Sequence, residues 1–231
     1  IGEYLAPDEI VAAAKEHTCR SIAYTYTEPT IFFEYAYETA RLAHEEGIKN
    51  VFVSNGYITE EAIRTIAPYL DAVNIDLKGL SEEFYHTNCG AHLEPVLDAI
   101  KLYQRLGIWV EVTTLVIPTL NDAEEDFRGI AEFIKGVGVE IPWHISQFYP
   151  TYKLTNLPLT PVSTLRKARE IGLEVGLRYV YEGNVPGEGG EHTYCYHCGR
   201  VLIRRYGFQI LENALSDTKC PYCGAVIDGV F

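Results

Sequence analysis

Six short runs of β-branched and aromatic residues alternate with six longer stretches of helical periodicity along the 231-residue chain. The predicted strands cover residues 21–26, 50–54, 72–77, 108–117, 143–149 and 178–182, and the predicted helices cover residues 7–16, 31–46, 60–69, 94–106, 122–135 and 161–173. Successive strands begin about 20 to 40 residues apart, which leaves room for a crossover helix between parallel strands. The alternation therefore predicts an α/β fold with a parallel sheet, either open and doubly wound or a TIM-like barrel.

Phosphate-binding glycine motifs do not accompany these strands. No Gly-x-Gly-x-x-Gly follows a predicted strand and no Gly-Lys-Ser/Thr loop occurs, which disfavours a dinucleotide-binding sheet. The chain opens with a predicted helix, whereas a complete barrel needs at least one more strand–helix unit. We expect that unit upstream of Ile1, and the lack of any methionine suggests that the chain is processed or a fragment. Residues 1–190 are thus predicted to form one α/β unit, and the choice between an open sheet and a TIM-like barrel stays open at this point.

The charge and the hydropathy pattern exclude two classes of partner. The chain carries 19 basic and 32 acidic residues, for a formal net charge of −13. Because a surface this acidic repels a phosphate backbone, we expect no nucleic-acid partner. Its apolar runs are far shorter than the roughly 18 residues of a membrane span, and no basic and apolar leader opens the chain. We therefore expect no membrane partner and a cytoplasmic location.

Residues 191–231 form a cysteine-bearing tail behind a glycine-rich stretch at 182–190. Two Cys-x-x-Cys-Gly turns, separated by 21 residues, supply Cys195, Cys198, Cys220 and Cys223. Two such turns bring four thiolates to one tetrahedral site, and the segments 201–205 and 207–211 between them are typical of a short hairpin. The tail is predicted to be a zinc-ribbon-like metal site.

The identity of the metal stays open at this point. Zinc is the leading interpretation, but a tetrahedral thiolate site also accepts a single iron, and the Cys-Pro-Tyr-Cys-Gly turn is similar to that of rubredoxin. Two disulfides are the alternative without a metal. A chain with no secretory signal gives that alternative little support, because a reducing compartment keeps thiols free.

Polar side chains gather where the predicted strands end. In the third strand, the period of two puts Asn74, Asp76 and Lys78 on one face and apolar residues on the other. Charge on a buried strand is costly unless it is paired or binds a ligand. The pattern therefore indicates either a pocket for a charged small molecule or an internal Asp76–Lys78 ion pair.

Three further side chains are weaker candidates. Glu111 shares a strand face with Thr113, and His144 lies in the fifth predicted strand, where a histidine is more often structural than catalytic. Cys89 could be a reactive thiol, but no neighbour that would lower its pKa can be placed from the sequence.

Together these segments resemble the radical S-adenosylmethionine enzymes, in the branch of the pyruvate formate-lyase activating enzymes, and within it the radical SAM enzymes of the AmmeMemoRadiSam system. The resemblance covers essentially the whole chain, and it implies that residues 1–190 form a partial TIM-like (β/α) radical SAM barrel. It rests on the paired cysteines of the tail, on Asn-Ile-Asp-Leu-Lys at 74–78, and on the segments 21–30, 53–56, 112–118 and 183–187.

The resemblance implies a set of cofactor-binding residues. Thr27 and Glu28 occupy the place of the family's Gly-Gly-Glu-Pro segment, in which the glutamate receives the amino group of the methionine moiety. Ser54 stands where activating enzymes place a threonine near the cofactor. Asp76 and Lys78 match an Asp-Leu-Lys that reaches the cofactor. His144 does not align with the family's carboxylate-binding histidine and receives no role.

The family's Cys-x-x-x-Cys-x-x-Cys, whose thiolates hold a [4Fe–4S] cluster, is absent from the 231 residues. We expect it upstream of Ile1 and expect the chain to be inactive without it. With it, the resemblance implies generation of a 5′-deoxyadenosyl radical and hydrogen-atom abstraction from an unknown organic or protein substrate. The alternative is a non-catalytic metal-ribbon scaffold, or a partner-binding protein, on a degenerate barrel.

Overall fold

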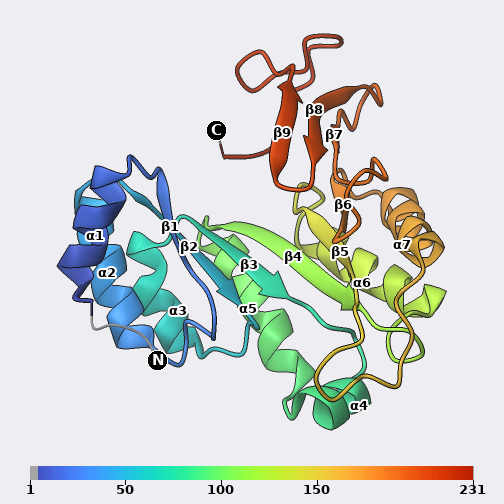
Figure 1. The fold of residues 1–231 in the computed structure, drawn as a ribbon, viewed down its shortest axis with the longest axis horizontal. Helices are drawn as coiled ribbons and strands as arrows, with labels where there is room; N and C mark the ends of the chain where they lie inside the picture. Colours follow the sequence, from blue (N-terminus) through green and yellow to red (C-terminus); the bar gives the residue numbers. More distant parts are fainter. Residues whose placement is uncertain (1–4, 231) are drawn as a thin grey trace. The chain divides into compact units, whose positions relative to one another are not determined.

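A computed structural model describes residues 5–230, and its main feature is one six-stranded parallel sheet in the order β1-β2-β3-β4-β5-β6 (Figure 1). Because the strands lie in the order in which they occur along the chain, the fold follows a (β/α) barrel and not a doubly wound sheet, in which the order reverses. The predicted α/β class is confirmed. The strands are β1 (Ser21–Tyr24), β2 (Lys49–Ser54), β3 (Ala72–Asp76), β4 (Trp109–Val116), β5 (Trp143–Gln147) and β6 (Val180–Gly183).

One helix precedes β1 and the others connect the strands, as the sequence predicts, with small shifts in their bounds. They are α1 (Pro7–Glu16), α2 (Phe33–Glu45), α3 (Glu60–Ile66), α5 (Leu93–Arg105), α6 (Glu124–Val137) and α7 (Val162–Val175). The predicted helix 60–69 tightens at its end into a 3₁₀ turn, Ala67–Tyr69, which contains Pro68. Two short elements were not predicted: the helix α4 (Glu82–Phe84) and the π-helical turn Tyr85–Cys89 that follows it.

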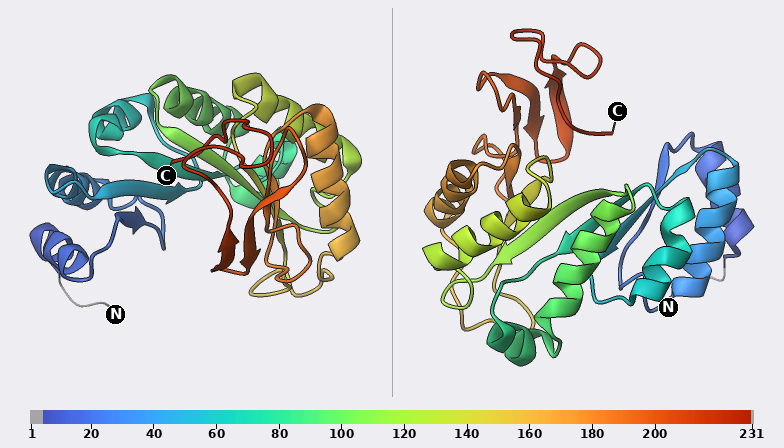
Figure 2. Two further views of the ribbon diagram at one scale, coloured as in Figure 1. Left: turned by 90° about the horizontal axis from the view of Figure 1, so that it is seen from above. Right: turned by 180° about the vertical axis from the view of Figure 1, so that it is seen from behind.

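The chain divides into two compact units. The first contains residues 1–76 and 92–110, and the second contains residues 77–91 and 111–231. In the first unit, β1, β2 and β3 pair in parallel and are flanked by α1, α2, α3 and α5 (Figure 2). The predicted division into residues 1–190 and 191–231 remains a prediction.

A buried asparagine joins the strands and helices of the first unit. Asn50 in β2 is fully buried, and its amide nitrogen donates to the carbonyls of Ala40 and Tyr69 at 2.9 Å each. Burial raises the pKa of Tyr24, so its hydroxyl stays protonated and donates to Asn50 Oδ1 at 2.9 Å. One side chain therefore satisfies polar groups from α2, β1 and the turn before β3.

The second unit contains β5, β6, most of β4 and the three-stranded antiparallel sheet of the tail. That sheet has the order β7 (Thr193–Tyr194), β8 (Val201–Tyr206) and β9 (Gln209–Asn213). Along β5, Trp143 and Ile145 are fully buried, whereas His144 and Ser146, which alternate with them, are only half-buried. Helix α7 packs on β5 and β6 from the buried side, where Gly172 leaves room for the Trp143 ring. The other face of β5 consequently carries the half-buried side chains of His144 and Ser146.

Replacing Asn50 with Ala should lower the free energy of unfolding by about 2–3 kcal/mol, because it leaves two carbonyls and the Tyr24 hydroxyl buried without partners. Urea denaturation of the two proteins measures this difference. The same substitution at the exposed Asn156 is the control and should change stability by less than about 0.5 kcal/mol. Equal effects at the two positions would show that the Asn50 contacts do not stabilise the fold.

Candidate functional site

A buried carboxylate lies where β1 and β2 end. Glu28, four residues beyond β1, is only 7% exposed, and Ser54 is the last residue of β2. Ser54 Oγ donates to Glu28 Oε1 at 2.8 Å, and the backbone N–H of Asn55 donates to Glu28 Oε2 at 2.8 Å. The structure thus brings two of the predicted cofactor-binding residues into direct contact, although they are 26 residues apart in the sequence.

Ser54 also fixes the turn that follows it. Its Oγ accepts from the backbone N–H of Gly56 at 3.0 Å while it donates to Glu28. Gly56 has φ +74°, and an added Cβ would approach Ile75 to 2.7 Å, so both the backbone conformation and the space require glycine. The loop after β2 is therefore held by one carboxylate–hydroxyl–amide relay.

The neighbouring strand adds a second carboxylate at the same end of the first unit. Asp76 is the last residue of β3, directly after Ile75, and Ile75 pairs with Ser54 in the sheet. Asp76 is half-buried, and Thr27, next to Glu28, is exposed. The carboxyl ends of three adjacent strands consequently carry three predicted residues in the compact unit: Glu28, Ser54 and Asp76.

Lys78 belongs to the second unit, and its main chain is fixed there. Its backbone N–H donates to the Tyr85 hydroxyl at 3.1 Å, and its carbonyl accepts from Asn121 Nδ2 at 2.7 Å. Tyr85 comes from the π-helical turn that the sequence analysis missed. Cys89, at the end of that turn, is partly buried, and burial raises the pKa of its thiol against the opposing charge of Lys78. A raised pKa is the property of an unreactive thiol.

The second unit holds a carboxylate–imidazole pair on the polar face of its strands. His144 Nε2 lies 2.7 Å from Glu111 Oε2, and the imidazole stacks on the Tyr181 ring at 5.1 Å. The sequence analysis placed Glu111 and His144 on strand faces separately and missed their pairing. The signal that could have found it is register, because His144 pairs with Thr113 and with Tyr181 across the parallel ladder.

A buried glutamate in β6 was also missed. Glu182 is 5% exposed, and the described structure gives its Oε2 no hydrogen-bond partner. Burial raises its pKa, against the opposing charges of Arg169 and Arg166. Gly190 lies directly against it, and an added Cβ there would come within 2.4 Å of the Glu182 carboxyl carbon.

The four tail cysteines converge. Their sulfur atoms all lie within 4.8 Å of one another, with Cys195 and Cys223 3.6 Å apart and Cys198 and Cys220 3.8 Å apart. All four are free thiols. A tetrahedron with metal–sulfur bonds of about 2.3 Å has edges of about 3.8 Å, so the spacing suits one tetrahedral ion.

Both cysteine turns have the same backbone geometry, which explains the convergence. The N–H of Gly199 donates to Cys195 O at 2.9 Å, and the N–H of Gly224 donates to Cys220 O at 2.9 Å. These glycines have φ +71° and +76°, a left-handed conformation that glycine adopts without strain. Each turn thereby directs two sulfurs toward one common centre.

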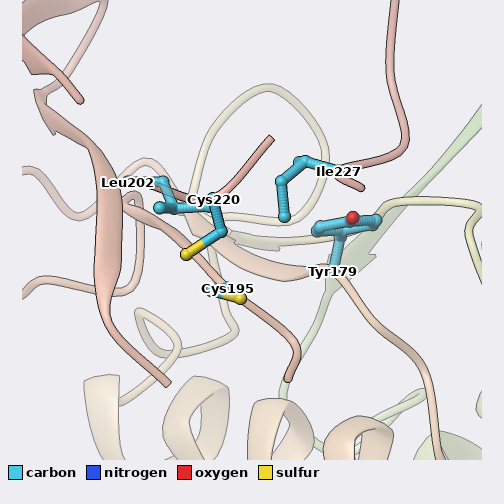
Figure 3. Close-up of a cluster of buried hydrophobic side chains, with 5 residues drawn as sticks. All are labelled: Tyr179, Cys195, Leu202, Cys220 and Ile227. Carbon is cyan, nitrogen blue, oxygen red and sulfur yellow. The ribbon is translucent and has the colours of Figure 1, made fainter. Parts of the chain in front are cut away.

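The first cysteine of each turn lies inside a small core. Cys195 and Cys220 are buried beside three apolar side chains, as Figure 3 shows: Tyr179, Leu202 and Ile227. Burial acts to raise the pKa of Cys220, but hydrogen bonds from the backbone N–H groups of Tyr222 and Cys223, and from neighbouring thiols, outweigh it and lower the pKa to about 7. A thiolate at this position is the form that binds a metal ion.

Comparisons with known proteins identify the family of the parallel-sheet part of the chain. Residues 2–134 match the Radical SAM superfamily. The chain is 47% identical over 227 residues to an uncharacterized protein of Methanocaldococcus jannaschii, and the match covers 97% of this chain and 67% of that protein. It is 25% identical over 155 residues to the pyruvate formate-lyase-activating enzyme of Clostridium pasteurianum, and the match covers 64% of this chain and 65% of that enzyme.

A solved structure shares the fold. SuiB of Streptococcus suis, determined with bound S-adenosylmethionine, has a TM-score of 0.65 at 13% sequence identity, covering 79% of this chain and 44% of SuiB. In the part of the chain that the structure describes, no helix is long and apolar enough to cross a membrane.

Replacing Ser54 with Ala should cost about 1–3 kcal/mol of unfolding free energy, because the buried Glu28 carboxylate loses its side-chain donor and the Gly56 N–H loses its acceptor. Urea denaturation midpoints measure the loss. Ser21→Ala, at an exposed serine of β1, is the matched control and should change stability by less than about 0.5 kcal/mol. A Ser54→Ala protein as stable as this control would contradict the relay.

Proposed function

The chain belongs to the radical SAM superfamily, and we propose that it supplies the S-adenosylmethionine-binding strands of an enzyme that abstracts a hydrogen atom from an organic or protein substrate. The observation that carries the proposal is the Glu28–Ser54 contact at the carboxyl ends of β1 and β2. Reactive groups of parallel barrels gather at these ends. Without such a site, the family match would support the fold but would not support a catalytic function.

The residues proposed to bind S-adenosylmethionine offer different chemical groups to different parts of the cofactor. We propose that Glu28 receives the amino group of the methionine moiety, because a buried carboxylate attracts an ammonium group strongly. Ser54 orients that carboxylate, and Thr27 borders the same segment. Asp76 and Lys78 offer one negative and one positive group for the ribose, the sulfonium or the carboxylate of the cofactor.

The printed residues do not fit the family's iron–sulfur cluster. Four of the six cysteines form the tail centre, and the other two are Cys19 and Cys89, so no Cys-x-x-x-Cys-x-x-Cys is available. When bound, a [4Fe–4S] cluster supplies the electron that cleaves the sulfonium of S-adenosylmethionine. We propose that its ligands come from a segment outside the printed residues, and that the 231-residue chain alone is inactive.

A non-catalytic role is the second candidate, and the missing cluster motif is the observation that favours it. A partner-binding scaffold would keep the sheet and the four-cysteine centre without needing a cofactor. For either role we propose a cytoplasmic protein without a nucleic-acid partner, because a net charge of −13 repels phosphate backbones.

For the tail, we propose one zinc ion held by Cys195, Cys198, Cys220 and Cys223, with a single iron as the alternative. Supporting this are the sulfur separations and the two matching turns. Both metals suit four thiolates, and zinc is favoured because it needs no redox partner.

Activity separates the two candidate functions. After anaerobic iron–sulfur reconstitution with a strong reductant, the 231-residue chain should make no 5′-deoxyadenosine, and a chain extended upstream of Ile1 should make it. In the extended chain, Asp76→Ala should lower the cleavage rate about tenfold or more, whereas Cys89→Ala should change it by less than about twofold.

Three results of this experiment would contradict parts of the proposal. Cleavage by the 231-residue chain would show that the cluster site is misplaced. An extended chain that contains the cluster motif but neither binds nor cleaves S-adenosylmethionine would support the scaffold. Equal losses from the two substitutions would remove the reason for placing the cofactor near β3.

The tail centre should hold about one metal ion per chain when the protein is purified without added metal. Elemental analysis measures the content and distinguishes zinc from iron. Cys220→Ser should lose the metal, whereas Cys19→Ser, at an exposed cysteine outside the centre, should retain it. Two disulfides and no metal would contradict the proposal.

A further inference from the structure

The tail shares its core with the residues that lead into β6. The buried residues around Cys195 and Cys220 include Tyr179, which precedes β6, and Tyr181 of β6 packs against the same cluster. The tail itself contributes the buried Leu202 and Ile227 besides the two cysteines, and three further apolar side chains that pack against them: Ile203, Leu215 and Ala225. The apolar support of the cysteine centre is therefore shared with the last strand of the parallel sheet.

Polar contacts join the same two parts. Arg178 Nη1 donates to Asp228 Oδ2 at 2.7 Å, and Tyr179 exchanges two 3.0 Å hydrogen bonds with Asp228. The guanidinium of Arg178 also lies 4.3 Å from the ring centroid of Tyr196, which stands between the two cysteines of the first turn. One turn and the chain end are thus fixed to the residues that lead into β6.

The tail also holds β6 and the loop 183–190 directly. Tyr181 shares a 3.0 Å hydrogen bond with Thr193, and Arg205 Nη1 donates to Thr193 Oγ1 at 2.7 Å. The Tyr194 hydroxyl donates to Gly189 O at 3.0 Å. Since Cys195 follows Tyr194 in the chain, the first metal ligand is adjacent to the side chain that holds the loop.

We propose that the metal in the four-cysteine centre positions β6 and the loop 183–190, so that metal content decides whether this strand end is ordered. The inference rests on the metal binding proposed above. Small cysteine turns lose their fold when the metal leaves, because four thiols alone supply little stabilisation. Release would free Cys195 and with it the Tyr194, Thr193 and Tyr179 contacts.

The strand end that the metal would position lies at the carboxyl end of the parallel sheet, where reactive groups of barrel enzymes gather. Gly183 is the carboxyl end of β6, and the loop that follows it is one of the loops that form the active face of a parallel barrel. Glu182, directly before it, donates its backbone N–H to Gly190 O at 3.1 Å and so closes the loop. The metal centre is therefore a remote positioning element for the sheet.

Hydrogen–deuterium exchange, read by mass spectrometry on the full chain, tests the proposal without cofactor or turnover. Zinc-loaded protein is compared with protein stripped by a chelator, and with Cys198→Ser and Cys89→Ser. Without metal, peptides covering residues 178–194 should exchange about tenfold faster or more, while peptides of β2 stay unchanged as an internal reference. Cys89→Ser should behave as the unmodified protein.

A second variant keeps the metal. Tyr194→Phe removes the bond to Gly189 O, and it should retain zinc by elemental analysis while exchange at 187–190 rises about threefold or more. The matched control is Tyr222→Phe. Tyr222 lies in the second cysteine turn with its ring under Arg200, and this substitution should leave exchange at 187–190 unchanged.

The outcomes distinguish the two proposals. Protein that binds no metal would overturn both. Protein that binds zinc but exchanges at 178–194 equally fast with and without it would overturn the positioning role and leave the metal site standing. Faster exchange spread evenly over the chain, β2 included, would also overturn it, since that is general destabilisation.

Discussion

Each strand of the parallel sheet has one buried face and one less buried face, and this alternation constrains where charged side chains can lie. In β3, Val73 and Ile75 are buried, while Asn74 and Asp76 on the alternate face are half-buried. In β5, Trp143 and Ile145 alternate with His144 and Ser146 in the same way. Because desolvating a charge is costly, charged side chains favour the less buried face, and polar groups on the buried face, such as Asn50 and Ser54, are paired by hydrogen bonds. The candidate site combines both, since Asp76 lies on the less buried face and the buried Glu28 carboxylate is held by Ser54 and Asn55.

The sequence predicted most of what depends on periodicity and spacing. The six parallel strands, their crossover helices and the meeting of the four cysteines are local patterns, and the structure contains them. It could not predict contacts set by register or by tertiary approach. The Glu28–Ser54 hydrogen bond joins the loop after β1 to the end of β2, and the Glu111–His144 pair needs the alignment of β4 with β5. Neither alignment is encoded in residues close together in the chain.

The site is also more constrained than a list of matching residues indicates. Glu28 appeared from the resemblance as a ligand for an ammonium group, yet it accepts hydrogen bonds from Ser54, Asn55 and Thr30. A carboxylate has about four lone-pair positions, so three donors leave room for a further one. A group held this firmly loses little entropy when it accepts a ligand, which is the advantage of preorganisation.

The shared core of the tail follows from its size. A segment of about 40 residues buries too little apolar surface to fold by itself, and such segments need a metal, a disulfide or a neighbour. Here Tyr179 and Arg178 provide the neighbour, and the four cysteines offer the metal site. Since each supports the other, neither the ribbon nor the end of the parallel sheet is expected to be stable alone. The sequence composition changes at residue 190, but side chains from both sides of that position pack in one cluster.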